Sequence, residues 1–211
     1  MRPTILSDPQ PLLKSLLGLL ACVVLAAIVG NYPRYLPPDF TSDFLRGRAD
    51  SFFGTYRWAF YAHLTAGPVA LLLGLALLSD RLRRRHPAWH RILGRAQMAV
   101  VLLVLVPSGL WMSASAATGT VAGLGFATLA LATAASAGLG WRAAVGRRFA
   151  AHGIWMTRLV ALLFSAVVLR LMSGLAILAG LDADWLYPAS AWASWLVPLA
   201  SCEAWRISRR G

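Results

Sequence analysis

Polar and ionisable side chains are rare in the long apolar stretches of this sequence, and each one is a candidate functional group. A titratable residue inside a bilayer costs several kcal/mol unless it is paired or hydrated, so it marks a functional site by default. Imidazoles can bind metals or haem iron, and charged groups can pair or carry protons. The residues of this kind are His63, His90, Gln97, His152, Arg158, Arg170 and Glu203.

His90 and His152 each stand at the start of an apolar stretch that follows a group of arginines. Both stretches enter the membrane from the same side, so the two imidazoles are at matching depth. Two neutral imidazoles facing one another across a bundle can bind a haem iron, and Gly94 leaves room for the ring. We predict a b-type haem with His90 and His152 as metal ligands; the alternative is two interfacial histidines bonded to water or headgroups. Cations that would neutralise the haem propionates are Arg91, Arg95 and Arg158.

Arg170 is predicted to lie on the opposite side of the membrane, at the level of His63. It follows His152 by eighteen residues, which at ~1.5 Å per residue places it ~27 Å along the helix. An arginine beside a titratable imidazole suits an anionic ligand, a quinone-like carbonyl or a haem propionate. His63 and Arg170 therefore form a second, outer polar site in our interpretation. The alternative is that Arg170 extends outward to Asp182 or Asp184.

Glu203 needs a cationic partner because it lies at helical spacing below two tryptophans, Trp192 and Trp195. Arg95 and Arg158 enter the membrane from the same side and are the candidates. We predict a structural ion pair between helices, and proton transfer by Glu203 is the sharper alternative.

The composition indicates which elements must position these groups. Hydrophobic residues make up 58% of the 211 residues and charged residues 13%, against ~45–50% apolar residues in soluble domains. This excludes a soluble globule and a disordered chain, and two cysteines exclude a disulfide scaffold. A helix crosses the membrane with ~20 mostly apolar residues. Six stretches qualify: Pro11–Gly30, Arg57–Leu78, Arg91–Ala114, Thr120–Ala143, His152–Leu178 and Trp185–Arg206.

The predicted fold is therefore an all-α, polytopic six-transmembrane-helix bundle. Its first apolar run is longer than the ~7–15 residues of a signal peptide, so we expect it to be kept as a helix. Residues 1–56 supply this helix and an outer loop, and residues 57–211 supply a five-helix core. No catalytic triad, phosphate-binding loop or zinc spacing is present.

The positive charges set the orientation, because cationic loops stay in the cytoplasm. Most of the 20 Lys and Arg residues fall in the loops after the second and fourth stretches and near the two termini. Both termini are thus predicted to be cytoplasmic. Topology and anionic lipid headgroups account for the net charge of +12, so nucleic acid is excluded as a partner. A membrane protein partner or a homo-oligomer stays open.

Residues 31–56 form the one sizeable loop. Pro37, Pro38 and Asp39 are typical of a helix start, and Phe40, Phe44 and Phe52 recur at multiples of four. We predict an amphipathic helix on the outer surface. An interfacial anchor is the favoured role, and a cap over an outer cavity is the alternative.

Several motifs together resemble a known family. They are His63 with Gly67, the run His90-Arg91-Ile92-Leu93-Gly94-Arg95, Gly125-Phe126, the run His152-Gly153-Ile154-Trp155-Met156-Thr157-Arg158, Leu169-Arg170-Leu171, and Trp192 to Glu203. Over residues 57 to 206 their order resembles the bacterial predicted membrane proteins called domain of unknown function twenty-three-oh-six. The resemblance implies a fold and no particular activity.

A weaker similarity is to the ascorbate-reducing b-type transmembrane cytochromes, whose four-helix core presents histidines to two haems. The stretch Thr120–Ala143 contains no histidine, so only the His90 and His152 pair keeps that pattern.

The leading functional hypothesis is a multi-pass protein of the bacterial inner membrane that binds haem b or a quinone and transfers electrons; as an enzyme it would be a haem-dependent oxidoreductase. An accessory membrane protein, or a carrier of a small solute or proton, is the alternative.

Overall fold

The fold is seen in a computed structural model, which describes residues 10–42, 45, 48–116 and 118–208. Helices account for nearly all of these residues, and no β-strand occurs among them. The long helices are α1 (Gln10–Gly30), α3 (Arg57–Leu77), α7 (Thr120–Val145) and α10 (Leu186–Ser208). Two composite rods complete the bundle: α5 (Pro87–Ala99), η3 (Val100–Leu105) and α6 (Val106–Ser113) form one, and α8 (Phe149–Leu163) with α9 (Ser165–Leu178) forms the other. The short elements are η1 (Tyr32–Arg34), α2 (Ala49–Ser51), η2 (Phe52–Tyr56) and α4 (Asp80–Arg85).

This all-α architecture is the predicted one, and the helix ends agree with the predicted stretches to within about one helical turn. Five described segments are long and apolar enough to cross a membrane: Leu16–Arg34, Phe52–Leu77, Pro87–Ser113, Thr120–Val145 and Phe149–Leu178. The sixth predicted stretch is the helix α10, which is not among them. Its serines, Glu203 and Arg206 lower its hydropathy. The count of six crossings and the cytoplasmic termini stay predictions.

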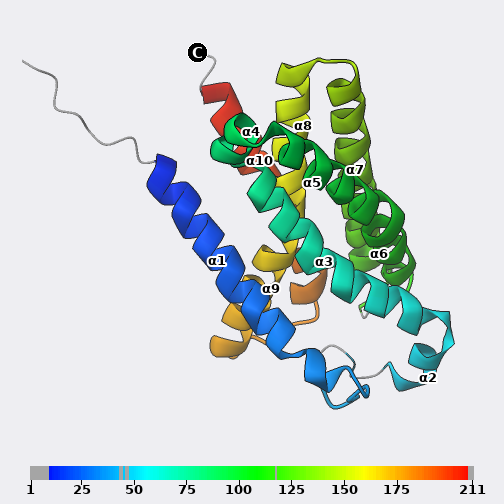
Figure 1. Cartoon of the computed structure of the whole chain (residues 1–211). Coiled ribbons are helices and arrows are strands. Elements are labelled where there is room, and N and C mark those ends of the chain that lie inside the picture. The colour runs from blue at the N-terminus through cyan, green and yellow to red at the C-terminus, as the bar shows by residue number, and fades with distance from the viewer. Residues whose placement is uncertain (1–9, 43–44, 46–47, 117, 209–211) are drawn as a thin grey trace, which may run out of the picture.

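The cationic parts of the chain gather at one end of the bundle (Figure 1). The beginning of α1, the short helix α4, the α7–α8 connection and the end of α10 all lie there, and the segment 31–56 lies at the opposite end. We call these the basic end and the loop end. This grouping is the one expected from the distribution of cations.

The third predicted stretch is one continuous rod with a wide helical turn in its middle. Residues Val100–Leu105 form π-helical hydrogen bonds before α6 begins at Val106. Pro107 follows directly and has no N–H to donate, so regular bonding is interrupted at this point. A π turn inserts one extra residue and rotates every later side chain around the axis.

The fifth predicted stretch is broken at Phe164, although no proline or glycine is near. The Phe164 amide still donates to the Val160 carbonyl at 2.9 Å, but the amides of Val167 and Val168 both donate to the Phe164 carbonyl at 3.0 and 3.1 Å. Helical hydrogen bonding is therefore irregular at one position between α8 and α9. The predicted stretch His152–Leu178 corresponds to the apolar segment Phe149–Leu178, and the local break at Phe164 is an addition to that prediction.

Small residues let the helices approach closely. A Cβ at Gly140 of α7 would lie 3.2 Å from the Trp155 Cβ of α8, and one at Gly125 would lie 3.1 Å from the Trp192 Nε1 of α10. That indole donates to the Val121 carbonyl at 3.1 Å. The glycines of α7 thus allow two tryptophan-bearing helices to pack on it.

The predicted amphipathic helix in the segment 31–56 is wrong. The Asp39 carboxylate accepts hydrogen bonds from the Thr41 amide at 2.9 Å and from its hydroxyl at 2.6 Å, which forms a turn. These bonds hold the pKa of the Asp39 carboxyl below its usual value. Phe40 and Phe52 do meet, with ring centroids 5.5 Å apart, but across a fold of the loop. Phe44 lies outside the described residues.

Candidate functional site: a cavity at the loop end

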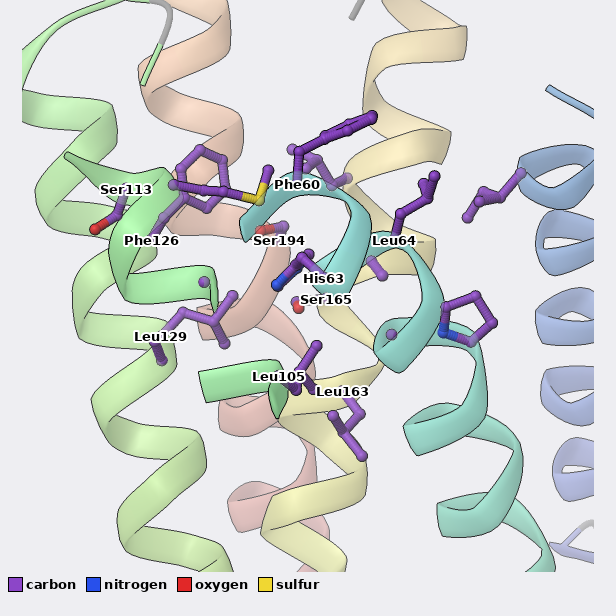
Figure 2. A pocket seen from close by; sticks show the side chains of 18 of the residues that line it. Phe60, His63, Leu64, Leu105, Ser113, Phe126, Leu129, Leu163, Ser165 and Ser194 are labelled. Atoms are coloured by element: carbon purple, nitrogen blue, oxygen red, sulfur yellow. The ribbon is translucent and has the colours of Figure 1, made fainter. Parts of the chain in front are cut away.

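A cavity of about 250 Å³ lies between the helices near the loop end. Side chains from α1, α3, α6, α7, α8, α9 and α10 line it, and Figure 2 shows His63 reaching into it from α3. Its walls are mostly aliphatic and aromatic, including Phe60, Phe126 and Tyr187. A concave, mainly apolar space with a few polar groups is the usual form of a small-molecule site.

His63 is the central polar group of the cavity. Its Nδ1 lies 3.2 Å from the Ser108 Oγ of α6, and the Ser108 hydroxyl donates to the Val104 carbonyl at 2.6 Å. A Cβ at Gly109 would lie only 3.2 Å from the His63 Cε1. The imidazole therefore rests against a helix surface that a larger residue at position 109 would occupy.

Hydroxyl residues that line the cavity, and Ser108 beside His63, were not singled out from the sequence. Ser108 and Ser194 are 5% and 1% exposed, and Ser194 Oγ has no hydrogen-bond partner among the described residues. The Thr133 hydroxyl donates to the Leu129 carbonyl of its own helix, and Ser165 lines the cavity at the start of α9. Serine and threonine are common in membrane helices, so their types alone gave no signal.

Arg170 lines the same cavity. It interacts electrostatically with Tyr32 and Tyr187. The structure thus brings His63 and Arg170 to one cavity, as the outer polar site requires, while ligand binding there stays a prediction. The alternative partners, Asp182 and Asp184, are in no ion pair within the described part of the chain.

The segment 31–56 also contributes to the rim, through Tyr35, Arg48 and Tyr56. Arg48 is 9% exposed, and its Nη1 donates to the Ser115 carbonyl at 2.7 Å and to the Tyr56 hydroxyl at 3.2 Å. The segment therefore lines part of the cavity, as a cap over an outer cavity requires, and both the cap and the favoured interfacial anchor stay predictions. Arg48 was not identified from the sequence as a cavity residue because it belongs to no helical pattern.

His90 and His152 lie near the basic end and do not line this cavity. They interact electrostatically with one another, so they are near neighbours in space. The His152 Nδ1 lies 2.9 Å from the Gly140 carbonyl oxygen, which can only accept, so Nδ1 carries the proton. The His90 Nδ1 is buried and has no partner among the described residues.

The arginines around these histidines differ in their surroundings. Arg91 and Arg95 are exposed. The Arg158 Nε donates to the Glu203 Oε1 at 2.6 Å, and its guanidinium carbon lies 4.4 Å from the centre of the Trp155 ring. Arg206 also donates to Glu203. The predicted ion pair of Glu203 is confirmed for Arg158.

Gln97 is a further polar residue of the predicted set, and it is 1% exposed. Its amide nitrogen and oxygen have no partner among the described residues. The nitrogen would lie 3.4 Å from a Cβ at Gly74, on the basic side of the cavity wall formed by Leu71 and Leu163.

These features define a polytopic α-helical membrane protein with a cavity among its helices. Residues 60–205 match the family described as predicted membrane protein (DUF2306), and the chain belongs to this family. No curated protein and no solved structure matches the chain. The weaker similarity to b-type cytochromes is therefore not shown.

Proposed function

We propose that this membrane protein binds a lipid-soluble ring compound of the quinone class in the cavity at the loop end. The observation that carries the proposal is the cavity itself, which brings His63 and Arg170 together within aromatic walls. The cavity lies among helices that are apolar enough to cross a membrane, which favours a lipid-soluble ligand.

The polar groups of the cavity match ring oxygens. His63 and Ser194 offer hydrogen-bonding atoms to a ligand, and Arg170 adds a positive charge that favours an electron-rich oxygen. Phe60, Phe126 and Tyr187 supply flat faces for a ring.

Calorimetric titration of the purified protein in detergent with an alkyl benzoquinone, in its quinone and quinol forms, tests this function. We expect saturable binding of at least one form. Gly109→Ala should weaken that binding about tenfold, because the added methyl group displaces the His63 ring and removes one good contact. Gly138→Ala on α7, where nothing lies within 4 Å of the new Cβ, should bind normally. Absence of saturable binding, or equal binding by both variants, contradicts the proposal.

A second candidate function is electron transfer through a b-type haem between His90 and His152. The fixed His152 Nδ1–H leaves Nε2 as a ligand atom, since a carbonyl-anchored imidazole is typical of metal sites. The His90 Nδ1 lacks a partner. Arg91 and Arg95 would pair with the propionates; Arg158 already pairs with Glu203.

A visible spectrum of protein expressed with ample haem tests this second function. Wild-type protein and His86→Ala should show a Soret band that shifts on reduction with dithionite. His90→Ala and His152→Ala should lose it. A colourless wild-type protein removes the haem hypothesis, and an unchanged band in both variants removes the ligand assignment.

We also infer residence in the bacterial inner membrane, with the basic end on anionic headgroups of the cytoplasmic leaflet. Asp80, Arg81, Arg84 and Arg85 border a hollow at that end. Cross-linking of the protein in its native membrane would reveal a partner protein or a second copy.

A further inference from the structure

The hydrogen bonds of His63 determine which kind of oxygen the cavity recognises. The chain of bonds begins at the Val104 carbonyl, which can only accept. The Ser108 hydroxyl lies 2.6 Å from that carbonyl and 3.1 Å from the Leu105 carbonyl. The Ser108 hydroxyl therefore donates its one proton to the backbone carbonyls of its own helix.

Because the Ser108 hydroxyl already donates to the backbone, it can only accept a hydrogen bond from the His63 imidazole. The His63 Nδ1, 3.2 Å from the Ser108 Oγ, must then carry the proton that makes this bond. A neutral imidazole has one protonated nitrogen and one bare nitrogen. The Nε2 of His63 is thus a hydrogen-bond acceptor.

The other hydroxyls that line the cavity add to this polarity. The Thr133 hydroxyl donates to the Leu129 carbonyl at 2.7 Å, and the Ser113 hydroxyl donates to the Leu110 carbonyl at 2.7 Å. Their oxygens therefore offer lone pairs only. Ser194, without a partner among the described residues, can both donate and accept. Two of these three hydroxyls thus present only acceptors to a ligand.

We propose that the cavity selects ligands through a hydroxyl group that donates to the His63 Nε2. This inference rests on the proposed function and refines it: the reduced quinol, or another phenol, binds in preference to the quinone. A hydroxyl donates to Nε2 and accepts from the Ser194 hydroxyl. A carbonyl or an ether bound against Nε2 leaves that nitrogen without a partner, and such an unsatisfied group weakens binding.

A matched pair of probes isolates the hydroxyl proton. The probes are 4-nonylphenol and 4-nonylanisole, which share ring and tail and differ by a methyl group on the oxygen. In calorimetric titration of the full-length protein we expect the phenol to bind at least about tenfold more tightly. His63→Phe should abolish this preference while still binding the anisole. Thr128→Ala, which removes a hydroxyl that is bonded to its own helix and does not line the cavity, should keep it.

Nitrogen NMR of the wild-type protein labelled in histidine gives a second measurement that needs no stable variant at the site. The His63 signals, identified as those that persist when His86, His90 and His152 are replaced in turn, should show a protonated Nδ1 and an unprotonated Nε2. The opposite tautomer overturns the inference. Equal binding of the two probes by the wild type also overturns it and leaves the proposed function standing, whereas absence of binding by both probes and both quinone forms overturns the proposed function with it.

Discussion

Tyr32 and Pro68 form a structural pair whose energy can be measured by a double-mutant cycle. Pro68 lies inside α3 and has no N–H, so the Leu64 carbonyl one turn earlier lacks its usual helical partner. The Tyr32 hydroxyl donates to that carbonyl. Tyrosine at the loop end thus replaces the hydrogen bond that proline removes from the helix.

The expected energies follow from this replacement. Tyr32→Phe leaves the Leu64 carbonyl unsatisfied and should lower the free energy of unfolding by about 1–3 kcal/mol. In a Pro68→Ala background the alanine amide can donate to Leu64, so the same Tyr32→Phe change should cost only about 0.5 kcal/mol. The coupling energy is the difference, about 0.5–2.5 kcal/mol, and it is large enough to resolve.

The assay is reversible unfolding of the four proteins in mixed micelles of a mild detergent and sodium dodecyl sulfate, followed by far-ultraviolet circular dichroism. Additive effects of Tyr32→Phe and Pro68→Ala would show that the Tyr32 hydroxyl does not stabilise the Leu64 carbonyl that Pro68 leaves without a helical partner. Tyr61→Phe is the control, because its hydroxyl donates to the Tyr35 carbonyl at 2.7 Å and its cost should not depend on residue 68.

Two further changes test the packing and the ion pair near the basic end. Gly140→Ala places a Cβ 3.2 Å from the Trp155 Cβ and should be less stable than Gly138→Ala by about 1–3 kcal/mol; the pair shares the same gain in helix propensity, and equal unfolding midpoints would contradict the close α7–α8 contact. Glu203→Gln replaces the carboxylate that accepts from Arg158 and should lower stability by about 1 kcal/mol, with a smaller dependence of the unfolding midpoint on salt than in the wild type. The two salt concentrations to compare are 0 and 0.5 M, about the range over which surface charges become screened. If Glu203→Gln leaves the free energy of unfolding unchanged at both, the pair contributes nothing to stability.

The helices were predictable because the bilayer imposes a length and an apolarity that local sequence must satisfy. The ends of α1, α3, α7 and α10 follow from where apolar runs meet arginines, glycines and prolines. The break at Phe164 was not predictable in this way, since Leu163 and Ser165 flank it and no residue there disfavours a helix by itself.

The candidate site was predicted in part for a related reason. His63 and Arg170 are conspicuous because charge is rare in the membrane, and helical rise alone places them at similar depth. Ser108 was missed because its position depends on the π turn at Val100–Leu105. One extra residue turns the following side chains by about 100°, so a regular helix drawn through this stretch assigns Ser108 to another face. The partner of His63 therefore required the structure.

Three irregularities of the backbone border the same cavity, and this coincidence supports its functional importance. They are Pro68 in α3, the π turn that ends at Leu105, and the break before Ser165, and all three residues line the cavity. Inside a membrane, backbone groups without partners are costly, so irregular backbone persists where protein or a polar cavity satisfies it. Here the Tyr32 hydroxyl satisfies the carbonyl opposite Pro68. A bundle selected for stability alone would have no reason to collect such positions at one place, whereas a binding cavity needs helices that diverge there.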